Sequence, residues 1–118
     1  MKYLLMIYAD ETAMLAAAPE NRTVMTSSYA AYIDAMQKAG VHLGGARLRP
    51  TTSATSIRVR NGKNEVLNGP YAETKEQLGG YFLIDAPDLD SAIAWASRCP
   101  GAASGAIEVR PVWDMQTP

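Results

Sequence analysis

The chain has 118 residues, of which 47% are hydrophobic and 19% charged, and its formal net charge is -1. This length suits a single domain, spanning 1–118, that can bury a real core. The near-neutral charge argues against binding of nucleic acid through a basic patch. No stretch approaches the roughly 18 apolar residues of a membrane span, so no membrane association is expected.

Cysteine usage and the N-terminus indicate where the protein works. The lone cysteine, Cys99, cannot form an internal disulfide, which favours a reducing compartment. We expect its thiol to be buried rather than nucleophilic, because no second cysteine or histidine stands beside it. Asp10 and Glu11 interrupt the apolar N-terminal run before it acquires the form of a signal peptide. The sequence therefore predicts a cytoplasmic protein.

The first third of the chain predicts a strand followed by a helix. Lys2–Tyr8 is a short apolar run typical of a strand with two apolar faces. Ala9–Arg22 is expected to be looser, with one helical turn through its alanines and a stop at Pro19. Thr23–Ala39 carries apolar residues at helical spacing, and Gly40 stands where a helix C-terminus favours glycine.

The middle of the chain predicts strands and a hairpin. Val41–Leu48 is expected to be a strand, with two glycines that permit a bulge or a close backbone approach. Ser56–Arg60 alternates apolar and basic residues, Asn61-Gly62 is typical of a hairpin turn, and Glu65–Leu67 forms the return strand. Tyr81–Ile84 is a second strand that is apolar on both faces.

The last third predicts a helix and a final strand. Asp88 is suited to cap the N-terminus of a helix that ends before Pro100-Gly101. Ile107–Trp113 is expected to be the last strand, with Ile107, Val109 and Trp113 on one side. The buried stripe of the helix is expected to comprise Leu89, Ala92, Ile93 and Ala96. The order βαβ, hairpin, βαβ predicts an α+β, ferredoxin-like fold with an antiparallel sheet.

This topology predicts a homodimer. Two helices cover only one face of an antiparallel sheet, yet Lys2–Tyr8 and Tyr81–Ile84 carry apolar side chains on both faces. The uncovered face would expose a larger apolar patch than monomers usually carry. We therefore expect a second copy to pack on that face, which makes a dimeric α/β barrel.

The stretch NGPYAETKEQLGG (68–80) lies between two apolar runs and carries the most specific signal. From this stretch through Trp95, and again in IEVRPV, the sequence closely resembles the DGPF family of the YCII-related superfamily. Asn68 and Tyr71 stand where that family usually has Asp and Phe. Asparagine keeps an acceptor and a turn preference but lacks the charge, so no role that needs a carboxylate is expected at position 68.

The resemblance implies a ferredoxin-like protomer in a dimeric α/β barrel, and a frequent setting beside extracytoplasmic-function sigma factors. The YCII branch carries a His–Asp pair proposed as catalytic, with the His on the first helix and the Asp after the second. This chain has no histidine on that helix, and Arg98-Cys99-Pro100 lies where the Asp would be sought. The pair does not transfer to this chain.

Glu73 and Lys75 are the predicted catalytic residues, because they stand in the densest ionisable cluster of the chain. A Gly-Pro entrance, a Gly-Gly exit and the expected barrel mouth favour a site there, since glycines let backbone approach a ligand. The alternative is a solvated turn whose ion pair contributes under about 1 kcal/mol. The predicted substrate-binding residues are Tyr8, Asn68, Gly69, Pro70, Tyr71, Thr74 and Gln77.

Other chemistry finds little support. His42 is the only histidine, so no metal site is expected, and no glycine-rich fingerprint indicates a cofactor. Arg47 and Arg49 suit an anionic ligand or simply a solvated strand end. Two functions stay open: a small-molecule-binding barrel with cofactor-free proton transfer of the lyase or isomerase kind, and a non-catalytic accessory module that contacts a transcription regulator.

Overall fold

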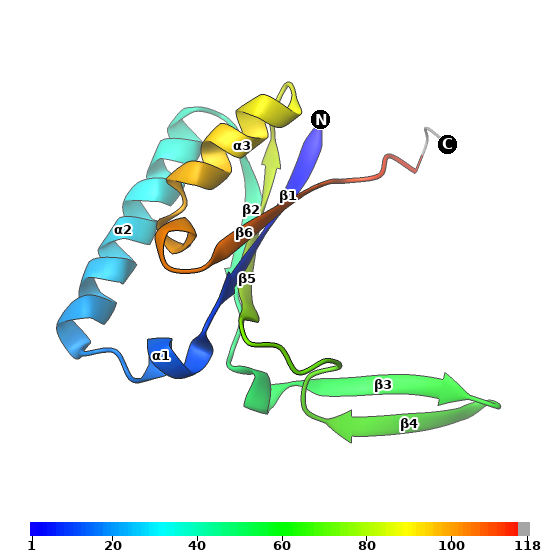
Figure 1. The fold of residues 1–118 in the computed structure, drawn as a ribbon. Helices are drawn as coiled ribbons and strands as arrows, with labels where there is room; N and C mark the ends of the chain where they lie inside the picture. Colours follow the sequence, from blue (N-terminus) through cyan, green and yellow to red (C-terminus); the bar gives the residue numbers. More distant parts are fainter. Residues whose placement is uncertain (116–118) are drawn as a thin grey trace.

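The computed structural model describes residues 1–115 and shows a mixed α+β fold with two antiparallel sheets and three helices (Figure 1). The strands are β1 (Lys2–Ala9), β2 (His42–Arg47), β3 (Thr55–Arg60), β4 (Lys63–Asn68), β5 (Gln77–Asp85) and β6 (Ala106–Pro111). The helices are α1 (Glu11–Leu15), α2 (Pro19–Lys38) and α3 (Leu89–Arg98), with 3-10 turns η1 (Thr51–Ser53) and η2 (Pro100–Ala103).

The larger sheet has the strand order β2-β5-β1-β6, and every neighbouring pair is antiparallel. Helices α2 and α3 lie on one face of this sheet (Figure 1). Strands β3 and β4 form a separate two-stranded sheet that projects away from the opposite side. The two layers of the main body are therefore a sheet and a pair of helices.

The core fills the space between the sheet and the helices. Alternate residues of β1 and β5 point towards α2 and α3, as the two-residue period of a strand requires. The ring of Phe82 packs edge-on against Tyr32, with centroids 5.6 Å apart. The remaining buried core residues are Tyr3, Leu5, Met36, Ile84, Ala86, Ala92, Ala96 and Cys99. A ligand between the sheet and the helices would have to displace this core.

Helix α2 begins four residues earlier than expected. Pro19 does not end a helical turn but occupies the first turn of α2, where its missing N–H and fixed φ are tolerated. The predicted C-terminus is confirmed, because Gly40 adopts φ 74°. Its N–H donates to the carbonyl of Gln37 and the N–H of Val41 donates to that of Met36, both at 3.0 Å, which forms a Schellman motif.

Helix α3 has the expected cap but a different buried stripe. The Asp88 carboxylate accepts from the backbone N–H of Ser91 at 2.8 Å, and this hydrogen bond lowers the pKa of Asp88. Ala92 and Ala96 are buried, whereas Leu89 and Ile93 are 48% and 46% exposed, so half of the predicted stripe is wrong. The small side chains of Ala92 and Ala96 let α3 pack closely on the core, and the larger side chains of Leu89 and Ile93 lie at the edge of this contact.

Tyr32 joins the two long helices. Its hydroxyl donates to the carbonyl of Trp95 at 2.7 Å, satisfying an acceptor in the last turn of α3. Burial raises the pKa of both Tyr32 and Tyr29. The Tyr29 hydroxyl accepts a long contact, 3.7 Å, from the thiol of Cys99, which is buried as the sequence predicts, and a backbone hydrogen bond with Gly101 partly offsets the rise of its pKa. Tyr32 therefore makes the stronger link.

Replacement of Tyr32 by phenylalanine should lower the free energy of unfolding by about 1 kcal/mol, because the Trp95 carbonyl loses its donor. Urea titration followed by circular dichroism measures the change. Tyr29→Phe is the matched control and should cost less, since a thiol is a weak donor. An equal or larger loss in Tyr29→Phe would contradict this assignment.

The centre of the sheet face opposite α2 and α3 is apolar, as the sequence predicts for β1 and β5, whereas Glu108 and Arg110 of the edge strand β6 lie on the same face and form an ion pair. Leu4 and Met6 of β1 alternate with the core residues, and Leu83 and Tyr81 are their partners on β5. Tyr8 continues the row, and none of these five side chains is fully buried. No helix of residues 1–115 covers this face (Figure 1). We call it the open face.

Two strand boundaries differ from expectation. Strand β5 begins at Gln77, so the double glycine lies inside the strand rather than in the preceding loop. A Cβ on Gly80 would lie 2.8 Å from the carbonyl oxygen of Ala46, so this position needs glycine for the packing of β5 against β2. Strand β6 ends at Pro111, and Trp113, predicted within it, lies beyond the strand and is 77% exposed.

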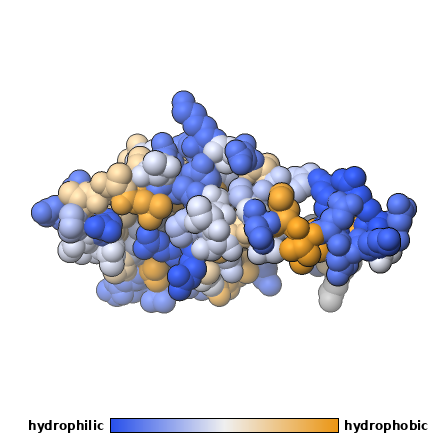
Figure 2. All heavy atoms as spheres, turned by 90° about the horizontal axis from the view of Figure 1, so that it is seen from below, coloured by the Kyte–Doolittle hydropathy of each residue, from blue (hydrophilic) through white to orange (hydrophobic). Residues whose placement is uncertain are grey.

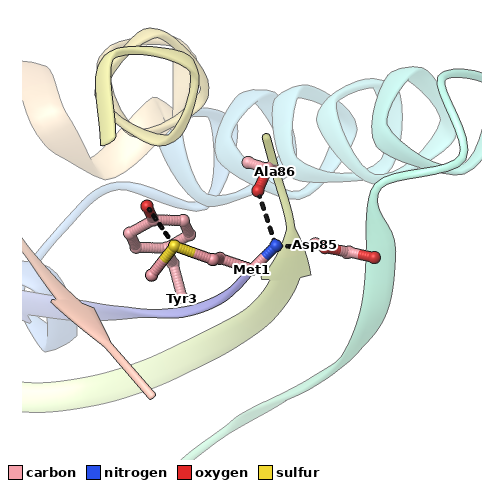
Figure 3. Close-up of polar contacts among 4 residues, drawn as sticks. All are labelled: Met1, Tyr3, Asp85 and Ala86. Carbon is pink, nitrogen blue, oxygen red and sulfur yellow. Dashed lines mark hydrogen bonds and ion pairs between the residues drawn. The ribbon is translucent and has the colours of Figure 1, made fainter. Parts of the chain in front are cut away.

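The start of β1 is fastened to the end of β5 (Figure 3). The Met1 amino group donates to the Asp85 carboxylate at 3.1 Å and to the Ala86 carbonyl at 3.0 Å. The Tyr3 hydroxyl points at the Met1 sulfur, 3.7 Å away. The ion pair is exposed, so its contribution to stability is under about 1 kcal/mol.

The molecule is flat and expanded. Its principal extents are 48 × 47 × 19 Å and its radius of gyration is 16.3 Å, against about 13.5 Å for a compact chain of this length. It exposes 8481 Å², whereas a compact monomer of 12.7 kDa exposes about 6,200 Å². The projecting hairpin and the open face account for this shape. Within residues 1–115, no helix has the length and apolar character needed to cross a membrane.

Candidate functional site

Two adjoining cavities lie where the hairpin joins the main body, with volumes of about 460 and 550 Å³. They share residues of η1 and of the segment between β4 and β5, and we call them together the elbow cavity. Both are open to solvent. The smaller cavity is lined by Thr51, Thr52, Asn68, Gly69, Pro70, Ala72, Glu73, Thr74 and Gln77. The larger shares five of these and adds Tyr8, Leu48, Arg49, Pro50, Ser53, Ala54, Tyr71 and Leu78.

Most of the residues singled out from the sequence meet at this cavity. Of the nine predicted site residues, eight line one cavity or both: Tyr8, Asn68, Gly69, Pro70, Tyr71, Glu73, Thr74 and Gln77. Lys75 lines neither and is exposed. Glu73 is also exposed, although it borders the smaller cavity. The structure thus separates the two predicted catalytic residues by their relation to the cavity.

Gly69 fixes the path of the chain at the hairpin root. It adopts φ 132°, a conformation that side chains other than glycine rarely allow. Its N–H donates to the Ala54 carbonyl at 2.8 Å, and its carbonyl accepts from the Ser56 hydroxyl at 2.9 Å. The Asn-Gly-Pro sequence is therefore a structural turn that closes the base of the hairpin and forms one wall of the cavity.

Gln77 holds the far end of the loop. Its side-chain amide donates to the Thr74 carbonyl at 2.6 Å, and its amide oxygen accepts from the backbone N–H of Glu11 at 3.0 Å. The Thr74 hydroxyl donates to the Glu76 carbonyl at 2.6 Å. These bonds tie the loop to itself and to the start of α1.

Glu11 links the η1 wall of the cavity to Gln77 at the start of β5. Its carboxylate accepts from the backbone N–H of Thr51 at 3.0 Å and from the Thr51 hydroxyl. Glu11 therefore bridges η1, through its side chain, and Gln77, through its backbone. Sequence reasoning placed Asp10 and Glu11 at the start of a loose segment, and it missed this role. The Asp10 cap on Ala13 and the acid in the first turn of α1 were the available signals.

The larger cavity has mainly apolar walls with one cation. Leu48, Leu78 and the rings of Tyr8 and Tyr71 contribute the apolar surface, and Arg49 contributes a guanidinium group. Arg58 of β3 lies over the Tyr71 ring, 4.8 Å from its centroid, on the hairpin side. Tyr71 is 73% exposed, and the Arg58 guanidinium helps to hold its ring in place. The arrangement suits a ligand with an apolar body and an anionic or hydrogen-bonding group.

The described residues show no cluster for a metal ion. Among residues 1–115, no three His, Cys, Asp or Glu side chains lie close enough together to hold one. His42 packs against Phe82, with ring centroids 6.1 Å apart, and does not line the elbow cavity. The polar groups of the cavity are instead carboxylate, amide, hydroxyl and guanidinium groups, which bind organic ligands by hydrogen bonds and charge.

Comparison with known proteins assigns the family. The model of the YCII-related domain matches residues 1–116. The chain belongs to the YCII-related family. An uncharacterized protein of Rhizobium meliloti (strain 1021) is 39% identical over 119 residues, which cover 95% of this chain and 92% of that protein. The resemblance inferred from the motif is confirmed at the level of this family, and the narrower DGPF assignment stays a prediction.

Proposed function

We propose that this YCII-related protein binds a small organic molecule in the elbow cavity and works as a homodimer. The observation that carries the proposal is the convergence of η1, β1, the start of β5 and the loop after β4 on one cavity of ligand size. Rigid strands hold two of these segments, and hydrogen bonds from Glu11 and Gln77 hold the loops. A cavity supported in this way needs little ordering when a ligand binds.

The walls indicate the class of ligand. Tyr8, Tyr71 and Leu78 suit a ring or a short aliphatic body, and Arg49 suits a carboxylate or similar anion. In the smaller cavity, the side chains of Asn68, Gln77 and Thr51 can form hydrogen bonds with uncharged polar groups of a ligand. The ligand is therefore a small organic anion with an apolar portion.

The strand order and the exposed area support the dimer. The antiparallel order β2-β5-β1-β6 with both long helices on one face supports a ferredoxin-like protomer, which the resemblance to the DGPF branch also implies. The surplus of about 2,000 Å² over a compact monomer is the area per chain that a large homodimer interface buries. A second copy on the open face would make the dimeric α/β barrel.

Chemistry in this cavity would depend on Glu73. It is the one carboxylate in the lining of the smaller cavity, and a carboxylate beside a bound ligand can take a proton without a cofactor. Lys75 has no place in this proposal, because it lines neither cavity. Proton transfer of the lyase or isomerase kind is thus assigned to Glu73 alone.

A thermal-shift screen with small organic anions tests the site. A ligand should raise the melting temperature of the wild-type protein, and Glu73→Gln should reduce its affinity about tenfold if the carboxylate accepts a hydrogen bond from a hydroxyl or amine group of the ligand. Lys75→Met is the matched control and should bind as the wild type does. Tyr71→Ala should also weaken binding, because it removes a wall of the larger cavity.

The outcomes separate the claims. Unchanged binding in Glu73→Gln with weakened binding in Tyr71→Ala would keep the cavity and remove Glu73 from its chemistry. Unchanged binding in both variants would place the ligand elsewhere and overturn the proposal.

A second candidate function is a non-catalytic dimeric module associated with a sigma-factor system. It is favoured by the exposure of both Glu73 and Lys75 beside uncovered apolar surfaces. Isolation of the native protein from cells distinguishes the two: a stable complex with a transcription regulator supports the second function. A homodimer that binds small anions without another protein supports the first.

A further inference from the structure

The hairpin formed by β3 and β4 carries an apolar face that its own chain leaves bare. Ile57 and Val66 are cross-strand partners, and Val59 follows on the same face of β3. These side chains are 62–65% exposed. Figure 2 shows hydrophobic atoms at the surface on the right-hand half of the molecule, where the hairpin lies among hydrophilic groups.

The opposite face of the hairpin has other contacts. Arg60 pairs with Glu65 at 3.3 Å, and Arg58 lies over the ring of Tyr71. The polar face therefore contacts solvent and the loop at the hairpin root. An isolated two-stranded hairpin is marginally stable in water, so an uncovered row of β-branched residues on its other face indicates a missing contact.

The direction of the hairpin indicates what provides that contact. Figure 1 shows β3 and β4 projecting from the open-face side of the sheet, away from α2 and α3. Stacked sheets pack about 10 Å apart, whereas a six-residue strand such as β3 extends about 20 Å. The hairpin is therefore long enough to pass the sheet of a second copy docked on the open face.

The area that a stable dimer buries also indicates that the hairpin takes part in the interface. The four-stranded sheet offers a face of only about 400 Å², because its strands are about 4.8 Å apart and about 20 Å long. A standard interface takes about 800 Å² from each partner. The surplus exposed area of this chain, about 2,000 Å², exceeds what the open face alone accounts for. The hairpin projects on that side and supplies further exposed apolar side chains, Ile57, Val59 and Val66.

We propose that the hairpin is a clasp that packs its Ile57, Val59 and Val66 face against a second copy of the chain docked on the open face. This inference rests on the homodimer of the proposed function. It adds that the partner docks beside the elbow cavity, because the hairpin root (Asn68, Gly69 and Pro70) forms a wall of that cavity.

The test compares two faces of the same hairpin. Ile57→Thr/Val66→Thr keeps the β-branched shape at both positions but removes apolar surface, and Leu67→Thr is the control on the opposite face, where the side chain is 58% exposed. Sedimentation velocity over a concentration series measures dimerisation of each full-length protein. We expect the double variant to raise the dimer Kd at least about tenfold and the control to leave it unchanged.

Hydrogen exchange supplies the second readout. In the wild-type dimer, the amides of 55–68 should exchange slowly, and in the double variant they should exchange fast while the amides of β1 and β5 stay protected. If the double variant and the control change the dimer Kd equally, or if neither changes it, the clasp is wrong but the homodimer remains. A monomeric wild-type protein would overturn both the clasp and the proposed homodimer.

Discussion

Replacement of Leu83 by glutamate should leave the protomer folded and abolish the proposed homodimer. Leu83 lies opposite Leu4 in the middle of the open face, which no helix of residues 1–115 covers. In a dimer packed through this face, each copy would bury an unpaired carboxylate, which costs several kcal/mol. The dimer Kd should therefore rise by about a thousandfold or more, measured by sedimentation velocity or by light scattering after size exclusion.

The control for this variant lies on the other layer of the molecule. Ile93→Glu places the same charge on α3, at a side chain already 46% exposed, and should leave the dimer intact. Circular dichroism checks that both variants keep the fold. Dimerisation that survives Leu83→Glu but fails in Ile93→Glu would move the interface from the sheet to the helices.

The sequence predicts the elements of the main body because their signals are local. A strand that is apolar on both faces, an Asn-Gly turn and a glycine after a helix each depend on a few neighbouring residues. All three are present in the structure, with Asn61 at φ 51° and Gly62 at φ 75° in the hairpin turn. The order of elements then limits the sheet to few topologies.

The predictions that fail depend on contacts rather than on local pattern. Leu89 and Ile93 have helical spacing with Ala92, but the exposed fraction of each depends on how far the neighbouring elements extend. Pro19 suits the end of one helix and the first turn of the next equally well, so the local sequence does not decide between them. Trp113 follows the alternation of β6, yet the pairing with β1 ends at Pro111.

The candidate site also combines residues that the local sequence predicts with residues that only long-range contacts bring together. The loop residues from Asn68 to Gln77 stand out through composition and resemblance, and most of them line the cavity. Thr51 and Glu11 escape notice because their contact joins positions 40 residues apart. No periodicity in the sequence indicates that a carboxylate on α1 faces a turn after β2. Only the folded arrangement brings them together.

Glu11 should prove the most sensitive support of the cavity. Its carboxylate accepts two hydrogen bonds from Thr51, and its backbone donates to Gln77. Glu11→Ala removes a charged acceptor and leaves the Thr51 N–H without its partner, so the free energy of unfolding should fall by about 2 kcal/mol. Urea titration measures this loss. The affinity for a cavity ligand should fall as well, because η1 and the loop would no longer be held together.

Two further variants separate the role of Glu11 from a general effect of charge. Glu20→Ala removes an exposed acid from the first turn of α2. Glu11 occupies the first turn of α1 in the same way, so Glu20→Ala measures what such an acid contributes through the helix dipole, and we expect this contribution to be small. Glu11→Gln keeps the length and one acceptor oxygen and should lie between the wild type and Glu11→Ala. If Glu11→Ala and Glu20→Ala lose the same stability, the helix dipole rather than the Thr51 contact explains Glu11. If ligand affinity also stays unchanged in Glu11→Ala, the elbow cavity does not depend on the bridge between α1 and η1.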